Sequence, residues 1–463
     1  MTMYTSTRGG SPDLPFADVL LTGLAPDGGL YVPTTWPETL APDPELPYAQ
    51  FAAEIMWPFV EGSIDRTSFD QISESAYATF AHDEVIPIET LAGGIELVEL
   101  FHGPTLAFKD VAMQMLGRLF DFELERRGTR TTIVGATSGD TGSAAIEAFR
   151  DRENVDIFIL HPHGRTSEVQ RRQMTTVHAS NVFNIAIEGT FDDCQDIVKA
   201  MFADVDFRER VQLGAVNSIN WARVMAQVVY YHWAVAKSAA RSGSSNGPVT
   251  ITVPTGNFGN VFAGRVAQRT GARIDRFVVA SNRNDILTQF FAAGSMTIGG
   301  VEPSLSPSMD IQVSSNLERL IYELLDDQGS AVAELMQQFR VAGHIDFAPS
   351  VTEKLSAGWT GHSLTDPETL EVIAAVNAEN DMLVDPHTAV GIGAAQRELA
   401  EGAGGTHLVM ATAHPAKFPD AVEQAMGIRP PLPDALSDLY EREERYEVLP
   451  NDLATVCDFV ESR

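Results

Sequence analysis

Short β-branched segments, each followed by a turn and a helical stretch, recur through the middle of the chain. The predicted strands lie at residues 131–134, 155–160, 182–187, 249–253, 277–280 and 406–411. Amphipathic stretches lie between or after them, as at residues 167–177, 192–202 and 316–339. Parallel strands need a crossover connection, which is usually a helix. The alternation therefore predicts an α/β fold in which parallel sheets are covered by helices on both faces.

The alternation does not extend to the two ends of the chain, which suggests a division into domains. Residues 1–93 hold turn-rich pieces and short amphipathic stretches, so we expect a mostly helical N-terminal domain. Residues 94–427 are expected to form the α/β domain, with a smaller subdomain at about 100–215 and a larger one at about 216–427. Residues 428–463, rich in proline and then in charge, are expected to form a C-terminal tail.

The chain is strongly acidic, with 63 Asp and Glu residues against 32 Lys and Arg residues and a formal net charge of −31. This argues against nucleic acid or an anionic membrane as a partner, because phosphate groups bind clustered cations. No apolar run approaches the ~20 residues of a membrane-spanning helix, and the first residues lack the apolar stretch of a signal peptide. Cys194 and Cys457 lie far apart, so a disulfide framework is not expected. We expect a reduced, cytoplasmic protein.

One lysine stands where its charge is poorly stabilised. Pro104 interrupts regular structure, Thr105 is a candidate N-cap, and a helix is predicted from about residue 106 to residue 122. Lys109 then lies in the first turn among apolar residues, where the helix dipole and desolvation both disfavour an ammonium ion. Both effects favour the neutral amine, the nucleophile that forms a Schiff base with an aldehyde. The alternative is that the side chain extends to solvent and that Asp110 offsets its charge.

Two glycine-containing loops share one design. Residues 139–142 (GDTG) and residues 256–259 (GNFG) each follow a predicted strand and open a predicted helix. Glycine lets the backbone approach a ligand, and the first turn of a helix offers free N–H groups, so each loop is a candidate anion site. Neither loop fits a nucleotide-binding signature. One such loop alone is usually a tight turn, but two of them together with Lys109 indicate a binding site.

Two anion sites and a neutral amine predict a cofactor that carries both a phosphate and an aldehyde, and a substrate with its own carboxylate. Pyridoxal phosphate meets the first description and serves as an electron sink for chemistry on amino acids. Thr412 follows the last predicted strand and can place a neutral hydroxyl against the pyridine nitrogen. The alternative is that Thr412 caps the helix that begins near Pro415. The aromatic-rich stretch at residues 221–236 is expected to form core rather than a cofactor site.

Four motifs resemble the threonine synthase family, in the branch found in many bacteria and in fungi. They are residues 99–110 (ELFHGPTLAFKD), 136–142 (ATSGDTG), 254–260 (PTGNFGN) and 412–418 (TAHPAKF). Two N-terminal stretches, at residues 4–8 and 23–33, match the same branch. The resemblance implies the tryptophan-synthase-β-like fold, which is fold type II of the pyridoxal-phosphate enzymes. It has two parallel-sheet subdomains, here joined to the N-terminal region.

The resemblance implies the conversion of O-phospho-L-homoserine and water to L-threonine and phosphate, the last step of threonine biosynthesis, with pyridoxal phosphate as the cofactor. It implies that Lys109 holds the cofactor and then acts as the base for the substrate Cα proton, and that Thr412 faces the pyridine nitrogen. The residues implied to cradle the cofactor phosphate are Gly256, Asn257, Phe258, Gly259 and Asn260. Those implied to contact the substrate carboxylate and the ring hydroxyl side are Thr137, Ser138, Gly139, Asp140 and Thr141. Many relatives in the wider fold carry Asn where this chain has Asp140.

The substrate phosphate needs cations, which are scarce in so acidic a chain. Arg165 and Lys417 are the candidates for this contact, with Arg8 behind them. His102 and His414 have no histidine partner at helical spacing, so we expect them to be hydrogen-bonded scaffold and we predict no metal site.

Two other classes of function remain open at this point. One is a related lyase on the same fold, such as a serine or threonine dehydratase or a sulfhydrylase. The other is a catalytically silent relative that binds phosphorylated amino acids, against which the intact Lys109 and both loops argue. The sequence leaves the oligomeric state open between a monomer and a homodimer.

Overall fold

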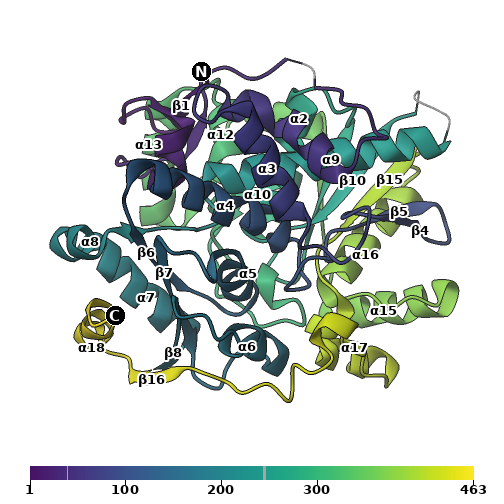
Figure 1. Ribbon diagram of the computed structural model, residues 1–463. Coiled ribbons are helices and arrows are strands. Elements are labelled where there is room, and N and C mark those ends of the chain that lie inside the picture. Colours follow the sequence, from purple (N-terminus) through teal and green to yellow (C-terminus); the bar gives the residue numbers. More distant parts are fainter. Residues whose placement is uncertain (39, 243–246) are drawn as a thin grey trace.

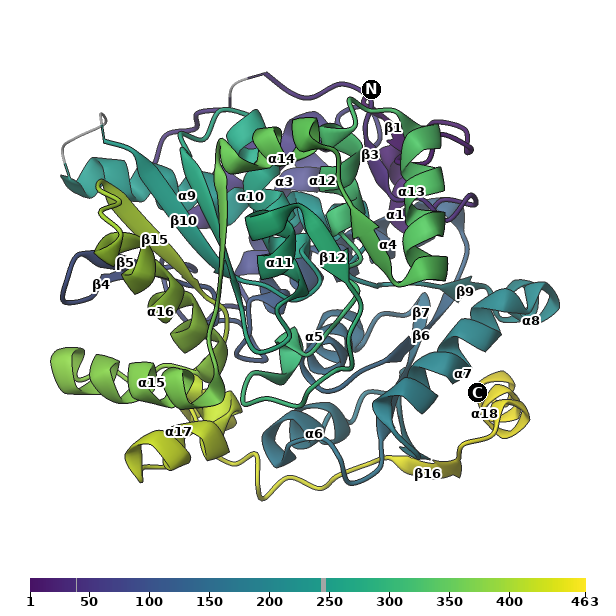
Figure 2. The ribbon, with the colours of Figure 1, turned by 180° about the vertical axis from the view of Figure 1, so that it is seen from behind.

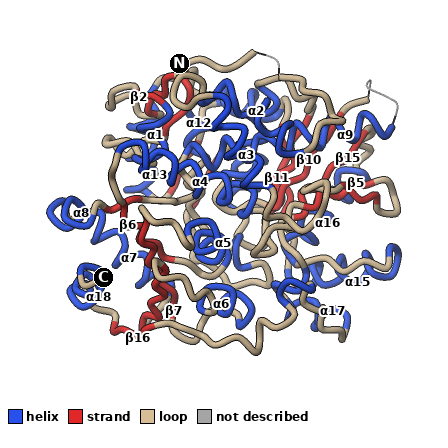
Figure 3. Tube along the Cα trace, viewed as in Figure 1, coloured by secondary structure: helices blue, strands red, loops and turns tan. Residues whose placement is uncertain are grey.

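Two sheets lie side by side and organise the structure (Figure 1 and Figure 3). The computed structural model describes residues 1–38, 40–242 and 247–463. Within these residues the larger sheet has six strands and the smaller sheet has five, with helices packed around both. The α/β fold of parallel sheets that the sequence predicts is thereby confirmed.

The larger sheet combines two early strands with four strands from the middle and late parts of the chain. Its strands, in spatial order, are β14 (Trp359–Ser363), β11 (Arg276–Ser281), β10 (Val249–Pro254), β15 (Thr406–Ala411), β5 (Ile95–Glu99) and β4 (Ile88–Thr90). Neighbouring strands pair in parallel, except that β4 runs antiparallel to β5 at one edge. The central strands β10 and β15 are almost wholly buried, as their apolar sequences require. In parallel sheets, ligands bind beyond the carboxyl ends of the strands.

The smaller sheet is entirely parallel. Its strands, in spatial order, are β16 (Glu447–Pro450), β8 (Val182–Glu188), β7 (Val155–Pro162), β6 (Thr131–Ala136) and β9 (Leu213–Gly214). Strand β16 comes from the segment expected to be a tail, and Figure 1 shows this yellow strand beside the teal β8. The helix that follows, α18 (Leu453–Glu461), buries Val456 and Val460 against the apolar residues of β7 and β8.

The N-terminal region adds a small antiparallel sheet and three helices. They are β2 (Leu14–Pro15), β1 (Met3–Ser6), β3 (Tyr31–Pro33), α1 (Phe16–Thr22), α2 (Tyr48–Val60) and α3 (Arg66–Tyr77). Aromatic contacts join this region to α9 (Trp221–Ser242). The ring of Tyr4 lies 5.7 Å from that of Trp221, and the ring of Phe51 lies 5.2 Å from that of Trp233. The region therefore packs directly on the helix that supports one wall of the site described below.

The other helices and turns surround the two sheets (Figure 2). The helices are α4 (Lys109–Arg127), α5 (Asp140–Phe149), α6 (Glu168–Thr175), α7 (Phe191–Ala203), α8 (Val205–Val211), α10 (Gly259–Arg269), α11 (Ile286–Ala293), α12 (Leu317–Leu324), α13 (Gly329–Ala342), α14 (Pro349–Ser356), α15 (Asp366–Asn380), α16 (Pro386–Ala400) and α17 (Pro419–Met426). The remaining elements are the paired strands β12 (Ser295–Thr297) and β13 (His344–Asp346), and the 3₁₀ turns η1 (Pro307–Met309), η2 (Pro415–Lys417) and η3 (Asp434–Leu436).

Two predicted helices differ from those observed. The helix expected from residue 106 begins at Lys109, and Thr105 does not cap it, because both the N–H and the hydroxyl of Thr105 donate to Asp110. The stretch at residues 316–339 forms two helices, separated by a turn in which Asp326 and Asp327 take positive φ. None of the helices that the structure describes is long and apolar enough to cross a membrane.

Candidate active site

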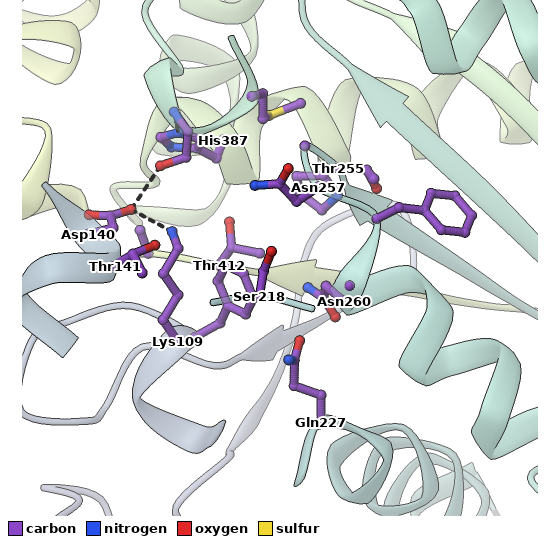
Figure 4. A pocket seen from close by; sticks show the side chains of 18 of the residues that line it. Lys109, Asp140, Thr141, Ser218, Gln227, Thr255, Asn257, Asn260, His387 and Thr412 are labelled. Atoms are coloured by element: carbon purple, nitrogen blue, oxygen red, sulfur yellow. Dashed lines mark hydrogen bonds and ion pairs between the residues drawn. The ribbon is translucent and has the colours of Figure 1, made fainter. Parts of the chain in front are cut away.

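A cavity of about 80 Å³ opens where loops of the two sheets meet, and most of the predicted site residues line it (Figure 4). The predicted residues on its wall are Lys109, Asp140, Thr141, Gly256, Asn257, Phe258, Gly259, Asn260 and Thr412. The predicted residues that do not line it are Thr137, Ser138, Gly139, Arg165 and Lys417. The cavity therefore gathers the lysine and both glycine loops, from segments far apart in the sequence.

Lys109 is the first residue of α4 and is placed by a tight turn. Leu106 in this turn has φ of 63°, and Asp110 accepts hydrogen bonds from Thr105 N at 2.8 Å and Thr105 Oγ1 at 2.7 Å. Gly103 is required beside them, since a Cβ at that position would lie 2.4 Å from the Cβ of Asp110. The motif around Lys109 is thus a folded unit that aims the lysine at the cavity. The alternative that the lysine extends to solvent is wrong, because its side chain is only 12% exposed.

The Lys109 ammonium group lies 3.0 Å from Asp140 Oδ2. Burial lowers the pKa of Lys109 below its usual range, and the nearby charges of Lys417 and Arg223 act in the same direction. Asp140 opposes the shift but does not cancel it. Burial pulls the pKa of Asp140 upward, yet the nearby charges, chiefly Lys109 and Lys417, together with the Gln170 hydrogen bond hold this pKa well below its usual range. The amine is therefore poised to lose its proton beside a carboxylate that stays ionised.

Asp140 is held by side chains from several elements. Besides Lys109, Oδ2 accepts a hydrogen bond from Ser308 Oγ at 2.9 Å. The other oxygen, Oδ1, accepts from Gln170 Nε2 at 2.8 Å and lies 3.2 Å from Lys417 Nζ. Three hydrogen-bond donors and the ion pair with Lys417 leave this buried carboxylate well satisfied, and they fix its orientation toward Lys109.

The loop at residues 256–260, the Gly256 loop, connects β10 to α10 and leaves its amides open. The N–H groups of Asn257, Phe258 and Gly259 have no acceptor among the residues that the structure describes. Phe258 takes φ of 64°, which turns the chain sharply into the helix. Gly256 lies so close to the Ser308 carbonyl that a Cβ there would be 2.6 Å from that oxygen. Free amides at the start of a helix form an anion site.

Asn260 supplies a further donor at the same loop. Its Oδ1 accepts hydrogen bonds from Tyr230 Oη at 2.5 Å and Tyr231 Oη at 2.8 Å, so its Nδ2 is fixed in direction. That Nδ2 is buried on the cavity wall without a partner among the described residues. A buried amide donor without a partner is unusual in a folded protein and indicates a ligand that accepts from it.

Thr412 follows β15 and borders the cavity beside Lys109 (Figure 4). The alternative that Thr412 caps the next helical turn is wrong, because η2 is capped by His414, whose Nδ1 accepts from Ala416 N at 3.1 Å. Burial lowers the pKa of His414 to about 4. His102 lies 2.7 Å from Glu99, so both histidines make hydrogen bonds within the scaffold.

None of the three cations proposed for a substrate phosphate lines the cavity. Arg165 is exposed on the turn after β7. Lys417 is fully buried, where it donates to the Thr105 carbonyl at 2.6 Å and pairs with Asp140. Arg8 makes a two-point ion pair with Glu318, with Nη2 2.8 Å from Oε2 and Nε 3.1 Å from Oε1. Lys417 therefore serves as an internal counter-charge within the site.

Sequence reasoning missed Arg223, which lines the cavity from α9 together with Ser218 and Gln227. Its side chain is buried, and Nε has no hydrogen-bond partner among the described residues. Burial lowers the pKa of Arg223 to about 10. The stretch is buried core as expected, and Arg223 and Gln227 also reach the cavity wall. A signal was present, since Arg223 is an isolated cation in an otherwise apolar and aromatic stretch.

Ser308, Met309 and His387 also line the cavity and were not foreseen. They come from η1 and from the start of α16, neither of which carries a glycine loop or a motif of known chemistry. Ser308 and Met309 lie on the connection between β12 and α12, and His387 lies on the helix that precedes β15. No local pattern in the sequence indicates that these residues reach the cavity.

The donors of the cavity fit a cofactor with an aldehyde and a phosphate. A buried lysine of lowered pKa faces the first group, and the open amides and the unpartnered Asn260 Nδ2 suit the second. These features define a pyridoxal-phosphate-dependent enzyme of fold type II. Comparison with family models agrees, since the model described as "Pyridoxal-phosphate dependent enzyme" matches residues 83–338.

Two further family models match the ends of the chain. "Threonine synthase N terminus" matches residues 3–77, and "Threonine synthase, C-terminal" matches residues 388–460. Among curated proteins, threonine synthase of Pseudomonas aeruginosa is 52% identical over 99% of this chain and 97% of its own length. Threonine synthase of Saccharomyces cerevisiae is 40% identical over 92% of this chain and 89% of its own length.

Solved structures agree with the sequence comparison. Pyridoxal-phosphate-bound threonine synthase from Brucella melitensis has a TM-score of 0.95 at 46% identity, covering 100% of this chain and 99% of that chain. Yeast threonine synthase has a TM-score of 0.92 at 36% identity, covering 99% of this chain and 98% of that chain. The chain belongs to the threonine synthase family.

Proposed function

We propose that this enzyme converts O-phospho-L-homoserine and water to L-threonine and phosphate, a carbon–oxygen lyase reaction on a phosphate ester. The observation that carries the proposal is one cavity onto which Lys109, the amides of the Gly256 loop and the buried Arg223 all open. The family and the names of its relatives support the same reaction. Bound pyridoxal phosphate supplies an electron sink for negative charge developing on the substrate carbons.

Lys109 has two tasks in this proposal. Its Nζ would hold the cofactor in the resting enzyme and, as a free amine, would take the proton from the substrate Cα. Burial lowers the pKa of Lys109 toward the range in which an amine both accepts and returns protons near neutral pH. Asp140 keeps this nitrogen in place through the contact at 3.0 Å.

Arg223 is the cation that we assign to the substrate phosphate, in place of Arg165 and Lys417. It is buried on the cavity wall, and its Nε is left without a partner by the described residues. A guanidinium in this position can donate more than one hydrogen bond to a phosphate. Ser218, in the same segment, adds a hydroxyl to the wall.

The Asp140 loop, residues 139–142, remains our proposal for the substrate carboxylate. Thr141 lines the cavity, and the neighbouring Ser138 is exposed at the mouth of the loop. Thr137 acts inside the loop, because its Oγ1 accepts hydrogen bonds from Gly139 N and Gly142 N at 2.9 Å. We propose that the Gly256 loop with Asn260 binds the cofactor phosphate and that the Thr412 hydroxyl faces the pyridine nitrogen.

The proposal is tested with purified enzyme, pyridoxal phosphate and O-phospho-L-homoserine. We expect equal amounts of phosphate and L-threonine to form, and no product from Lys109→Ala. Arg223→Met should raise KM for the phosphorylated substrate about tenfold to hundredfold, since a hydrogen bond to a charged group contributes about 1.5–3 kcal/mol. Borohydride reduction followed by peptide mapping should place the cofactor on Lys109.

Two outcomes would contradict the proposed reaction, and a third would contradict the assignment of Lys109. Release of ammonia from serine or threonine, without turnover of O-phospho-L-homoserine, would identify a dehydratase on the same fold. Binding of the phosphorylated amino acid without any product would identify a catalytically silent relative. A borohydride label on another lysine would show that Lys109 does not hold the cofactor.

We infer that the reaction takes place in the cytoplasm. Cys194 and Cys457 are both free thiols in the structure, which is typical of proteins in a reducing compartment. A measurement of its mass in solution distinguishes a monomer from a homodimer.

A further inference from the structure

One segment, residues 302–316, touches both glycine loops. At one end Ser314 Oγ donates to the Gly256 carbonyl, and Asn316 Nδ2 donates to the Asn257 carbonyl at 3.0 Å. In its middle, Ser308 Oγ donates to Asp140 Oδ2 at 2.9 Å. The segment belongs to the chain around the larger sheet, whereas Asp140 follows a strand of the smaller sheet. The Ser308 hydroxyl is therefore a link between the two halves of the site.

The turn that carries Ser308 is held from the start of α16. The backbone N–H of Ser308 donates to His387 Nε2 at 3.2 Å, and His387 Nδ1 lies 2.7 Å from Asp385 Oδ2. Asp385 is itself fixed as the N-cap of α16, because its carboxylate accepts from the N–H groups of His387 and Thr388 at 3.0 Å. His387 and Asp385 are buried, with side chains only 4% and 0% exposed.

These contacts fix the proton position on His387. A backbone N–H can only donate, so Nε2 must be the acceptor and carries no proton. A carboxylate can only accept, so the proton lies on Nδ1 and points at Asp385. The Nε2 lone pair is thus occupied by the Ser308 backbone. His387 orients a neighbour and does not exchange protons with a substrate.

The hydroxyl of Ser308 matters because Asp140 Oδ2 has two donors, Lys109 and Ser308. When Lys109 turns to the substrate, its hydrogen bond to this buried oxygen is lost. Ser308 is then the remaining donor on that oxygen, which would otherwise be left without one at a substantial energetic cost. A fixed Ser308 also keeps Asp140 in the orientation to which Lys109 must return.

We propose that His387, oriented by Asp385, is a positioning residue of this enzyme. It fixes η1 so that the Ser308 hydroxyl stays on Asp140 and links the two sheets across the active site. This inference rests on the proposed function where it concerns turnover, but its structural core concerns only these residues. It predicts that His387 and Ser308 act as one unit.

The test compares His387→Leu, His387→Gln, Ser308→Ala and the double variant with Leu and Ala, all loaded with pyridoxal phosphate. Leucine removes the acceptor, whereas glutamine places an amide oxygen near the position of Nε2. We expect His387→Leu and Ser308→Ala each to lower kcat for phosphate release about tenfold with a smaller change in KM, as loss of one hydrogen bond implies. His387→Gln should retain most of the activity.

The double variant separates a shared role from two independent ones. Because His387 acts through Ser308, the double variant should lose no more activity than His387→Leu alone. The proposal would be overturned if the fold-losses of the two single variants multiply in the double variant. It would also be overturned if His387→Leu and His387→Gln lose equal activity. Should His387→Leu fail to fold, the decision falls to Ser308→Ala, which must lower kcat about tenfold with a smaller change in KM, and an unchanged kcat would overturn the proposal.

Hydrogen–deuterium exchange gives a measurement that is independent of turnover. His387→Leu should increase deuterium uptake in residues 302–316 of the loaded enzyme, and His387→Gln should not. Unchanged uptake in His387→Leu would overturn the proposal even if the variant has lost activity. If O-phospho-L-homoserine is not a substrate, the proposed function fails, and the exchange result still decides whether His387 holds the segment.

Discussion

The two glycine loops look alike in sequence but differ in what fills them. The Asp140 loop is closed by the protein itself, with Lys109, Lys417, Gln170 and Ser308 all directed at its carboxylate. The Gly256 loop leaves its amides and Asn260 Nδ2 unpaired among the described residues. The Asp140 carboxylate of the first loop is therefore a structural charge centre that tunes Lys109, while Thr141 of the same loop lines the cavity where we propose that the substrate carboxylate binds. The second is a receptor, and it is completed only by a ligand.

The largest effect should come from removing the charge at the centre of the first loop. Asp140→Ala leaves Lys109 and Lys417 buried without the carboxylate with which both of them pair. We expect the free energy of unfolding of the protein without cofactor to fall by about 3–5 kcal/mol, the usual cost of breaking a buried ion pair. Urea unfolding measures this. Asp196→Ala removes an exposed ion pair with Lys199 and should change it by less than about 1 kcal/mol.

A substitution in the Gly256 loop should weaken the binding of pyridoxal phosphate. Gly256→Ala introduces a Cβ 2.6 Å from the Ser308 carbonyl, so the loop must shift away from its cavity position. We expect the Kd for pyridoxal phosphate to rise about tenfold to hundredfold, as an overpacking cost of about 1–3 kcal/mol implies. Fluorescence titration measures it. Gly404→Ala is the control, because a Cβ there meets nothing within 4 Å. An equal rise in Kd for both variants would refute the steric argument.

Acid should lower the free energy of unfolding by a smaller amount than Asp140→Ala does, through two buried histidines. Burial lowers the pKa of His161 in β7 and of His232, which bonds Thr270 at the end of α10, to about 4. Between pH 6.5 and 4 the unfolded chain binds protons at these histidines that the folded chain does not. The free energy of unfolding therefore falls as the pH falls, by about 2 kcal/mol for each histidine at pH 5.

Substitution of one histidine checks this pH dependence. His232→Gln should reduce the loss of stability between pH 7 and pH 5, measured by urea unfolding at both values. His344→Gln, at an exposed histidine, is the matched control for the loss of an imidazole. A His232→Gln variant with the full pH dependence would show that this histidine is protonated in the folded protein.

The parts of the site that the sequence predicts are those built from local signals. Lys109 and both loops lie directly beside a strand end or a helix start, so a short stretch of sequence specifies their position. Strand β15 is predicted with the observed limits, since it is a buried apolar run between turns. Ser308 and His387 have no such local signal, and the signal for Arg223 is only its isolated charge in an apolar stretch. These residues reach the cavity from α9, η1 and α16 through tertiary packing, which depends on contacts between distant residues.

Two local signals misled for physical reasons. Lys417 lies in a motif that borders the cavity, but the η2 turn directs its side chain inward to the Thr105 carbonyl and Asp140. Thr105 has the residue type of an N-cap, yet its hydroxyl and N–H are already engaged by Asp110. In both cases a tertiary partner outcompetes the role that the local sequence favours.

Strand β16 has a consequence for how the protein is made. It covers the outer edge of β8 and is translated long after β8 leaves the ribosome. Until then the nascent chain carries an uncovered sheet edge, the kind of surface that recruits other strands and leads to aggregation. Shortening the gene before the codon of Glu447 should therefore yield inclusion bodies, although every residue of the catalytic cavity is still encoded.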